Sequence, residues 1–591
     1  MNFYRENIQI IMNRWPNQVL DIERAQAIKT KCANKNNIDL LGDVGAEGVI
    51  LILGFGNGAM AREILRKSRH HIVIVYERDL SKLKWALQTK SLAKLLASTQ
   101  FLLLSGPVMD LSWLNAFHWI MTNSKFWIIR DKLATKGYSE FYDEIQRKVK
   151  TEKQFADINV GTQISLGKKF ANAILENVPS IVKAQGIISL QNRFRGMPAI
   201  IVSSGPSLDG EIQGLRRAKG KSVILCVDTA LPTLLKHGIF PDFVTGIDPL
   251  PDNKALFKMK GARDLPFICM SQYTPDVLKL HKGPLFVSAQ QGNVFYNWLQ
   301  WFWSDKGNLE SFGGSVSHFA TNVAEWMGCN PIGLLGQDLC FTSKYHAGGV
   351  TKLLHDGMGL EEPDETIGAI KTKNCKGKKV FTKATLISFK TAFENKIASC
   401  PGISIVNLTS NGLKIEGATI MPLKRFLSLY GKPVTISMPQ NGSCEVDLPG
   451  LIERLDLGMK IFKGIVKVNH RILKLIHKTM DARKINDRPA IHKYVKKIET
   501  LYPLTKHPIL SLLSSYHFHL ELYLKKKQIR EIDQIKGKKW VKLDRQLDRG
   551  LNFYAEIIEA ADLLMKELRI LKRRLTNNAK EENENARSET A

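Results

Sequence analysis

The stretch that decides the fold reads Ala199-Ile200-Ile201-Val202-Ser203-Ser204-Gly205-Pro206-Ser207-Leu208-Asp209. An apolar, β-branched run ends there in small residues and a Gly-Pro pair, and a polar, helix-like segment follows at 211–219. This order predicts a strand, a tight turn and a helix N-terminus. Small residues at such a turn leave backbone N–H groups open, and the helix start adds partial positive charge. The stretch therefore predicts either a phosphate site or a plain α/β turn.

Length and composition indicate a folded protein of several domains. The chain has 591 residues, too many for one core, and its 44% hydrophobic and 24% charged residues are ordinary for a globular protein. The net charge of +29 is not ordinary, and it favours an anionic partner: nucleic acid, a membrane surface, an acidic protein or a nucleotide. Because no zinc finger or other nucleic-acid-binding motif accompanies this charge, we expect no nucleic-acid partner.

The eight cysteines are scattered without a C-x-x-C pair, which argues against a zinc site and against a disulfide framework. We therefore expect no metal. The first residues lack the charged and apolar regions of a signal peptide, and no apolar run approaches the roughly 18 residues that a membrane-spanning helix needs. The sequence thus predicts a cytoplasmic protein without membrane insertion.

Residues 1–165 predict a Rossmann-like α/β domain. A buried strand at 48–53 enters the turn Gly54-Phe55-Gly56-Asn57-Gly58 and then a helix, and a second strand at 71–76 ends at Glu77. A carboxylate about twenty residues after a glycine-rich turn has the spacing that holds a ribose in dinucleotide or S-adenosylmethionine sites. Two interpretations stay open: a cofactor site, or a Rossmann-like half whose glycines serve only the turn. A further strand is expected at 101–104.

Residues 166–430 predict a second Rossmann-like domain, entered through a helix at 162–190. In open α/β sheets ligands bind beyond the carboxyl ends of the strands. One aspartate at such a place is typical of a helix cap, but several in one domain indicate a binding site. A Gly-Gly-Ser, Gly313-Gly314-Ser315, opens a predicted helix at 316–328. Four of the apolar runs end in polar residues: Asp228-Thr229, Asp248-Pro249, Ser288 and Gly336-Gln337-Asp338.

Two stretches after Asp338 are predicted as loops. The first has titratable tips and contains His346, and the second covers residues 357–384. The second loop is rich in lysine, which either attracts an acidic partner or forms a solvated face. Its lysines are Lys371, Lys373, Lys376, Lys378 and Lys379.

Taken together, these motifs resemble the motility-associated-factor glycosyltransferases. The resemblance is dense over about 165–425, and these bacterial enzymes are implicated in adding nonulosonic acids, pseudaminic or legionaminic acid, to Ser or Thr of flagellin. It implies a protein O-glycosyltransferase that takes a CMP-activated nonulosonic acid as donor and modifies flagellin before export. It assigns no particular cofactor to the enzyme. The motifs that carry it are Ser203-Ser204-Gly205-Pro206-Ser207-Leu208, Asp228-Thr229, 238–242, 246–249, 313–316, 335–339 and 407–418.

The same central domain is similar to bacterial sialyltransferases that use CMP-sialic acid. In those enzymes the Gly-Pro-Ser turn and the polar strand ends hold the CMP part of the donor. The similarity implies that Asp338 lies beside the donor site as a catalytic candidate. The donor-binding residues that it implies are Ser204, Gly205, Pro206, Ser207, Asp228, Thr229, Asp248, Gly314 and Ser315.

The resemblance breaks at the general base. The sialyltransferases carry a histidine just before their late helix, where this chain has Phe381-Thr382-Lys383. Transfer to a hydroxyl benefits from a base whose pKa lies near the working pH. We therefore nominate His346 as the catalytic base, with His355 behind it. The other interpretation of His346 is a surface histidine without function.

From about residue 430 the chain changes character and predicts a basic helical domain at 431–591. Apolar residues recur at steps of three and four between 553 and 575, which is typical of a helix-packing stripe. Residues 451–591 hold 31 Lys and Arg against 18 Asp and Glu. The polar tail from Asn577 is predicted to be disordered. This domain either packs beside the central domain or holds the acceptor protein.

Two other functions stay open. The same broad superfamily includes a pterin diphosphokinase that uses ATP, for which Asp228, Asp248 and Asp338 would offer carboxylates to Mg²⁺. The N-terminal Rossmann-like half, the helical C-terminal part and the length of the chain speak against that activity. The third candidate is a non-catalytic flagellin-binding protein that keeps a nucleotide pocket, because the sialyltransferase-like histidine is missing.

Overall fold

The structure is a computed structural model of the whole chain, and it describes residues 3–28, 48–67, 71–107, 126–250, 252–289, 294–298, 306–309, 313–341, 369–409, 411–439, 447–501, 508–516 and 539–589. Its contacts divide the chain into two compact units, Met1–Thr162 and Gln163–Ala591. The division falls within the long helix α7, Ser139–Lys183. The C-terminal helices belong to the same contact unit as the central sheet, and the predicted boundary at 430 stays a prediction.

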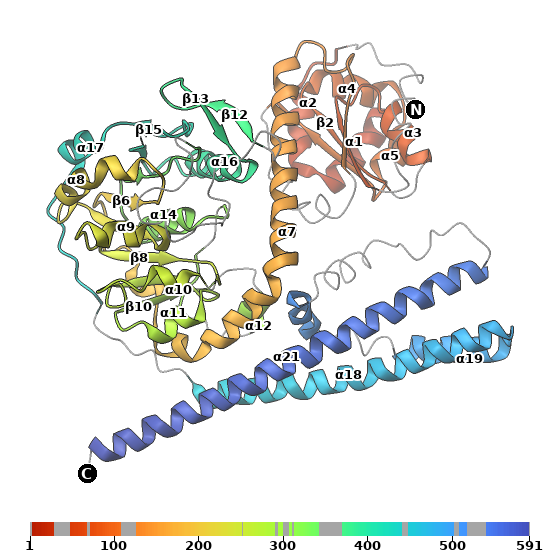
Figure 1. Cartoon of the computed structure of the whole chain (residues 1–591). Coiled ribbons are helices and arrows are strands. Elements are labelled where there is room, and N and C mark those ends of the chain that lie inside the picture. Colours follow the sequence, from red (N-terminus) through yellow and green to blue (C-terminus); the bar gives the residue numbers. More distant parts are fainter. Residues whose placement is uncertain are drawn as a thin grey trace. The chain divides into compact units, whose positions relative to one another are not determined.

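The first unit is a parallel sheet of four strands in the order β3-β2-β1-β4 (Figure 1). Alternate residues of β1 and β2 face two separate cores, and the start of α7 covers one face through Tyr142, Ile145 and Val149. The predicted Rossmann-like fold is therefore confirmed for this unit. Its elements are α1 Phe3–Arg14, η1 Pro16–Gln18, α2 Val19–Arg24, β1 Gly48–Leu53, α3 Ala59–Lys67, β2 His71–Glu77, α4 Leu80–Thr89, α5 Ala93–Leu96, β3 Phe101–Ser105 and β4 Phe126–Arg130.

The second unit is built on a nine-stranded sheet in the order β15-β14-β11-β6-β7-β8-β9-β10-β5, paired in parallel throughout. Its central strands are continuous apolar runs, as strands buried on both faces require. The strands are β5 Gln185–Gly186, β6 Ala199–Val202, β7 Val223–Val227, β8 Phe243–Gly246, β9 Phe267–Met270, β10 Leu285–Ser288, β11 Ile332–Leu335, β14 Ile405–Asn407 and β15 Thr419–Ile420.

The direction of chain progression reverses between β6 and β11. From β6 the chain adds β7, β8, β9 and β10 on one side, and then returns to place β11 on the other side of β6. Such a reversal leaves a crevice beyond the carboxyl ends of the two adjacent strands. The residues that follow β6, 203–207, and those that follow β11, 336–338, are thereby brought to one place.

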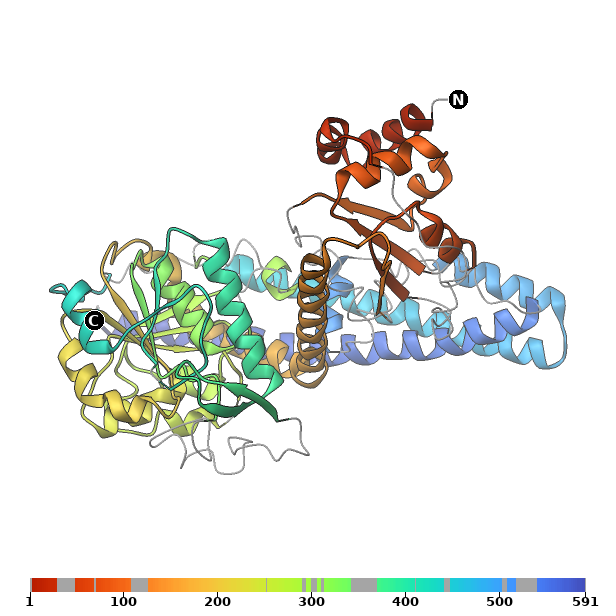
Figure 2. The ribbon, with the colours of Figure 1, turned by 90° about the horizontal axis from the view of Figure 1, so that it is seen from above.

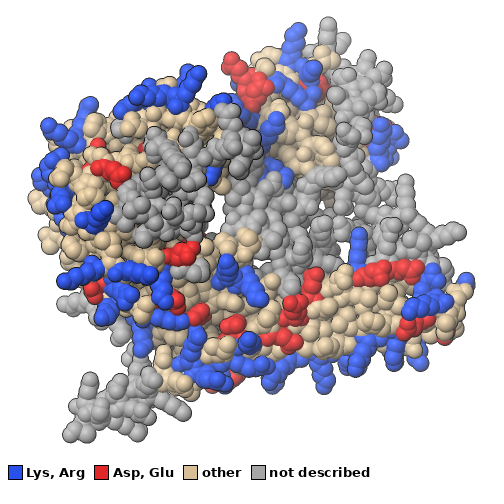
Figure 3. Space-filling view, in the orientation of Figure 1, with Lys and Arg blue, Asp and Glu red and all other residues tan. Residues whose placement is uncertain are grey.

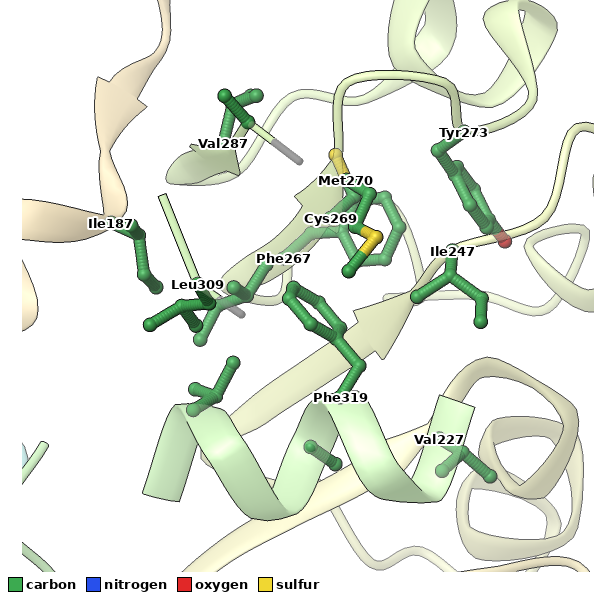
Figure 4. Close-up of a cluster of buried hydrophobic side chains, with 14 of the residues drawn as sticks. Ile187, Val227, Ile247, Phe267, Cys269, Met270, Tyr273, Val287, Leu309 and Phe319 are labelled. Carbon is green, nitrogen blue, oxygen red and sulfur yellow. The ribbon is translucent and has the colours of Figure 1, made fainter. Parts of the chain in front are cut away.

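The helices of this second unit pack against the sheet and against one another. Helix α14, Val316–Trp326, lies against β6, β7 and β8, and its Phe319 points into a cluster with Phe267 and Met270 (Figure 4). Helix α17, Leu423–Tyr430, packs on α8, Leu208–Ala218, where Gly214 faces Leu423. The other helices are α9 Leu231–Lys236, α10 Asn253–Leu256, α11 Pro275–Leu280, α12 Val294–Trp298 and α16 Ala384–Ser399, with the 3-10 turns η3 Ile187–Leu190 and η4 Asp228–Ala230.

The C-terminal part is the predicted helical region, and its two longest helices form an antiparallel pair. Helices α18, Leu448–Lys484, and α21, Lys539–Glu589, run side by side in both ribbon views (Figures 1 and 2). Two ion pairs cross between them, Asp456 with Lys572 and Arg483 with Asp544. Helix α19, Arg488–Leu501, and the 3-10 segment η7, Pro508–Ser515, complete this part, and its apolar residues join the core of the central sheet.

Three sequence expectations are corrected here. Residues 357–384 were expected to be loop, but β12, Ile370–Lys373, and β13, Lys379–Thr382, pair as an antiparallel hairpin. The helix expected at 162–190 is longer at its start and ends at Lys183, before β5 and η3. The tail from Asn577 was expected to be disordered, but α21 continues to Glu589, because Ala, Lys and Glu are good helix formers even without an apolar face.

Among the described residues, no helix is both long enough and apolar enough to cross a membrane.

Candidate functional site

The turn after β6 and the end of β11 are joined by hydrogen bonds at the switch point. Ser207 donates to Oδ2 of Asp338 from its backbone N–H and from its hydroxyl, each at 3.0 Å. Gly205 N donates to Gly336 O at 2.9 Å. A Cβ on Gly205 would overlap Asp338 Oδ2 and Gly336 O, so only glycine allows the two loops to approach this closely. The structure thus brings the predicted residues Gly205, Ser207 and Asp338 together.

The backbone N–H groups of this turn are largely used within the protein, which favours the plain α/β turn over the phosphate site at these N–H groups. Because the turn closes on β11 and on itself, its donors point at protein acceptors rather than at a ligand. Among the described residues, the N–H of Ser204 alone has no such acceptor between 203 and 209. The pairs are Ser203 with Leu335 O, Gly205 with Gly336 O, Ser207 with Asp338, Leu208 with Gly205 O and Asp209 with Pro206 O.

Asp338 is buried, and only one of its two carboxylate oxygens accepts hydrogen bonds from the described residues. Its exposed fraction is 2%, and its Oδ1 is buried without a hydrogen-bond partner among the described residues. Burial raises the pKa of this carboxyl to about 6, although the two hydrogen bonds from Ser207 lower it. The group is therefore an anion at neutral pH, with one oxygen free to accept.

The backbone around Asp338 is held in an unusual conformation. Leu339 has φ of 58°, a left-handed value that costs a leucine about 1–2 kcal/mol. Two contacts hold it there: Leu413 N donates to Asp338 O at 2.8 Å, and Thr382 Oγ1 donates to Leu339 O at 2.8 Å. Strain of this kind persists only where surrounding structure fixes it, and it gathers at functional sites.

A buried hydroxyl network links three elements behind the turn. Ser203 Oγ lies 2.8 Å from Ser317 Oγ and donates to Gln337 Oε1 at 2.8 Å. Gln337 N in turn donates to Thr409 Oγ1 at 3.1 Å. Through these contacts the end of β6, the first turn of α14 and the end of β11 keep a fixed spacing.

Asp228 and Thr229, at the end of β7, form the second wall of the site. Asp228 is 2% exposed and accepts from Thr229 N at 2.8 Å and from Tyr273 OH at 2.9 Å. Burial is the main cause that raises the pKa of Asp228 to about 7; the hydrogen bond from Tyr273 acts against this rise, and the nearby charge of Asp248 adds to it. Thr229 Oγ1 donates to Ser204 Oγ at 3.2 Å, so this wall touches the turn.

Asp248 lies near Asp228 and takes no part in the hydrogen bonds of the turn within the described residues. Its backbone carbonyl accepts from Asn253 Nδ2 at 3.0 Å and from Thr274 Oγ1 at 3.1 Å, which fixes the loop after β8. Burial raises the pKa of its carboxyl to about 6. Asp248 therefore faces the same region as Asp228 but stands apart from the Ser207–Asp338 contact.

Gly314 and Ser315 begin helix α14, and a buried histidine fixes them. Nδ1 of His318 accepts from Ser315 N at 3.2 Å and contacts Ser315 Oγ at 2.8 Å, and its Nε2 faces Phe389 O at 3.0 Å. Burial lowers the pKa of His318 to about 4, so the ring is neutral. Ser315 acts as a helix cap, and the N–H groups of Val316 and Ser317 receive no acceptor from the described residues.

The predicted base falls beyond the part of the chain that the structure describes. His346 and His355 lie within 342–368, so their roles stay predictions. At the place of the missing sialyltransferase histidine, Thr382 is buried against Leu339 and the ammonium of Lys383 lies 5.3 Å from the centre of the Phe341 ring.

Sequence reasoning missed three residues that build this site: Ser317, His318 and Tyr273. His318 stands three residues after Ser315, the position whose side chain completes a capping box, and that spacing was a readable signal. Tyr273 fits because Gly246 has no side chain; a Cβ there would overlap the tyrosine ring. No local pattern links those two residues.

The glycine-rich turn of the first unit is closed by protein. Phe55 N donates to Glu77 Oε2 at 2.8 Å, and Tyr142 OH donates to Glu77 Oε1 at 3.1 Å. A Cβ on Gly54 would overlap Ala134. Glu77 is 1% exposed, and burial raises its pKa to about 7. These contacts favour the interpretation in which the glycines serve the turn, because the carboxylate expected to hold a ribose is already engaged.

Among the described residues, no three His, Cys, Asp or Glu side chains are grouped as ligands of a metal ion.

Comparison with known proteins agrees with this fold. Residues 172–344 match the model of a family described as 6-hydroxymethylpterin diphosphokinase MptE-like. The chain is similar to the solved structure of the MAf glycosyltransferase from Magnetospirillum magneticum AMB-1, with a TM-score of 0.53 and 13% identity over 98% of this chain and 96% of that chain. No curated protein matches the chain. The predicted resemblance to motility-associated-factor enzymes is thus confirmed at the level of the fold.

Proposed function

We propose that this protein is a glycosyltransferase that moves a nonulosonic acid of the pseudaminic or legionaminic type from a CMP-activated donor to Ser or Thr of flagellin before export. The observation that carries the proposal is the half-satisfied carboxylate of Asp338 beneath the Gly-Pro-Ser turn, at the switch point of a parallel sheet. This is where open α/β sheets bind nucleotides. The fold shared with a MAf glycosyltransferase supports it.

In the proposed reaction the bond between the anomeric carbon and the phosphate oxygen breaks, and CMP leaves with the electron pair. The hydroxyl oxygen of the acceptor bonds to that carbon and gives its proton to a base. The donor departs through an oxocarbenium-like state, which lowers the demand on that base. His346, which follows Asp338 by eight positions in the sequence, is the residue we propose for this proton.

The described residues have separate tasks in this proposal. The start of α14 receives the donor phosphate, because the open N–H groups of Val316 and Ser317 and the helix dipole favour an anion there. Asp338 accepts a hydroxyl or amino hydrogen of the CMP part at Oδ1, and its Oδ2 keeps Ser207 in place. Ser204 in the turn and Thr229 in the second wall of the site offer hydroxyl groups.

A second candidate is a diphosphokinase that acts on a pterin with ATP. The match of residues 172–344 to the MptE-like family favours it. That activity would use Asp228, Asp248 and Asp338 near Mg²⁺. In this structure both oxygens of Asp228 already accept hydrogen bonds, and Oδ2 of Asp338 holds Ser207, so a metal would have to displace or share them. A flagellin-binding protein without turnover is the third candidate.

The test is the intact mass of flagellin after incubation with the purified protein and a CMP-nonulosonic acid. We expect a gain in multiples of one sugar residue, together with release of free CMP. Flagellin from cells with and without the protein gives the same comparison in vivo. Unchanged flagellin mass with pterin diphosphate formed from ATP would replace the transferase by the diphosphokinase. Tight CMP-sugar binding with no CMP release would support the non-catalytic binder.

A further inference from the structure

One edge of helix α18 carries a continuous row of exposed cations. Their steps of three and four residues keep them on one face, and the row spans about 27 Å at about 1.5 Å per residue. The opposite face is buried in the core. Figure 3 shows Lys and Arg along the lower edge of the α18 and α21 pair, and Asp and Glu along its upper edge. The row, called the α18 stripe below, is Lys460, Lys463, Lys467, Arg471, Lys474 and Lys478.

The stripe is not used by the fold. No residue of the stripe forms an ion pair within the part of the chain that the structure describes, since the nearby acids have other partners: Asp456 pairs with Lys572 and Asp481 with Lys484. Like charges three or four residues apart on a helix cost about 0.2–0.5 kcal/mol per pair. The row therefore lowers the stability of the free protein, which is what an unoccupied electrostatic binding surface does.

A groove opens at one end of the stripe. It lies between α18 and α21 and has a volume of about 500 Å³. Lys460 and Lys463 line it from α18, and Arg569 and Arg573 line it from α21. Thr576 and Asn577 add neutral hydrogen-bonding groups. Within the described residues, Arg569 and Arg573 are exposed and form no ion pair, so the groove presents four free cations around one engaged acid, Asp456.

We propose that the α18 stripe and this groove bind an acidic α-helix of a partner protein. A helix with Glu or Asp at steps of three and four residues matches the row of cations in spacing. The seat between two antiparallel helices is the place that a third helix takes in a bundle. A bilayer surface is flat and does not enter such a groove, and the arginine, threonine and asparagine groups suit carboxylates that reach in from a helix.

This inference goes beyond the proposed function. In the proposed transferase the docked protein is the acceptor, but docking needs neither donor nor turnover. Binding is therefore measured without any CMP-sugar, so a failure of docking and a failure of transfer are seen separately.

The test titrates the full-length protein with a synthetic helical peptide of about 25 residues, long enough to be helical in water, that carries Glu at steps of three and four residues. The probes for comparison are a peptide with the same composition in scrambled order, anionic phospholipid vesicles and duplex DNA. We expect the patterned peptide to bind best, with an affinity that falls as salt is raised. Better binding of the scrambled peptide, the vesicles or the DNA overturns the proposal.

Charge reversal then locates the site. The triple variant Lys463→Glu, Lys467→Glu and Arg471→Glu should bind the patterned peptide about tenfold or more weakly, and should recover binding to a peptide with Lys in place of Glu. A matched control reverses three exposed lysines of the central domain, Lys236, Lys258 and Lys260, with the same change in net charge. If the control variant loses as much affinity for the patterned peptide as the stripe variant, the overall charge of the protein, not the stripe, binds the peptide. Because the three stripe residues are exposed and unpaired within the described chain, the helical circular dichroism should stay unchanged.

Discussion

At the scale of single residues, Asp338 divides two tasks between its two oxygens. Oδ2 holds the Ser207 turn, whereas Oδ1 is buried and accepts nothing from the described residues. A buried acceptor without a partner costs about 1–3 kcal/mol. Folding stability alone does not explain such a group. A ligand that donates a hydrogen bond to Oδ1 would remove the cost.

Asp338→Asn tests this division through pH. If the carboxylate accepts from the donor, CMP-sugar affinity in the wild type should be constant above about pH 7 and should fall as the pH drops through the pKa of about 6. The asparagine variant should bind about tenfold more weakly at pH 8, with no such step. Calorimetric titration from pH 5 to pH 8 measures both proteins.

The stability of the same variant should change in the opposite sense. Because the folded pKa of Asp338 lies above its ordinary value of 3.8, the charged form costs stability, and this cost sets in as the pH rises from about 4 to 6. The asparagine side chain carries no charge, so the variant should be no less stable than the wild type at pH 8 in denaturant unfolding. A variant that is both unfolded and inactive would contradict the assigned role.

Gly205 gives a second test with a control five residues away. Gly205→Ala places a Cβ against Asp338 Oδ2 and Gly336 O, so the turn must open, and we expect donor binding to be lost. Gly210→Ala, in helix α8, meets no atom within 4 Å and should raise stability by about 0.5–1 kcal/mol with binding kept. Donor titration and urea unfolding of the pair separate the two. Retained donor binding in Gly205→Ala would disprove the assigned site.

At the scale of elements, the start of α14 depends on His318, a residue that was not among the predicted site residues. Neutral His318 accepts from Ser315 N, faces Phe389 O and packs against the Phe393 ring. It therefore joins α14 to α16 and fixes where the first turn of α14 begins.

His318→Ala should lower the free energy of unfolding by about 3 kcal/mol, as for other large buried rings, because it leaves a cavity and takes the acceptor away from the partly buried N–H of Ser315. His318→Gln should lose less, since glutamine at the third helical position completes a capping box with Ser315. Urea unfolding at pH 8 compares the three proteins. An equal loss in both variants would show that packing, not the cap, is the contribution of His318.

The elements that the sequence predicted are those whose pattern is local. The strands β1, β7 and β11 are continuous apolar runs, and the turns after them are small or polar residues that stand out in the sequence. The β12–β13 hairpin was missed because exposed lysines interrupt its apolar residues. The contact of Ser207 with Asp338 joins residues 131 apart, so only the strand order, which local patterns do not encode, creates it.

At the scale of the whole molecule, the two contact units hold separate buried carboxylates. Glu77 closes the glycine-rich turn of the first unit, and Asp338 lies in the second. Among the described residues, the two hydrophobic cores of the first unit contain no residue that follows Val149 in the sequence, so neither core includes a side chain of the second unit. Each unit thus has the means to unfold as a cooperative body of its own.

Glu77→Ala tests that independence. It leaves the N–H of Phe55, the N–H of Asp79 and the hydroxyl of Tyr142 without their acceptor, so the first unit should lose about 2–4 kcal/mol. For a unit of this size that corresponds to a fall of about 5–10 °C in its own melting temperature. In differential scanning calorimetry the melting temperature of the second unit should stay unchanged in Glu77→Ala. Added CMP should raise the melting temperature of the second unit only, because a ligand stabilises the unit that binds it. If Glu77→Ala lowers the melting temperatures of both units together, the units unfold as one body. If CMP raises the melting temperature of the first unit, the nucleotide site lies in the first unit, and the assignment to the switch point beside Asp338 is wrong.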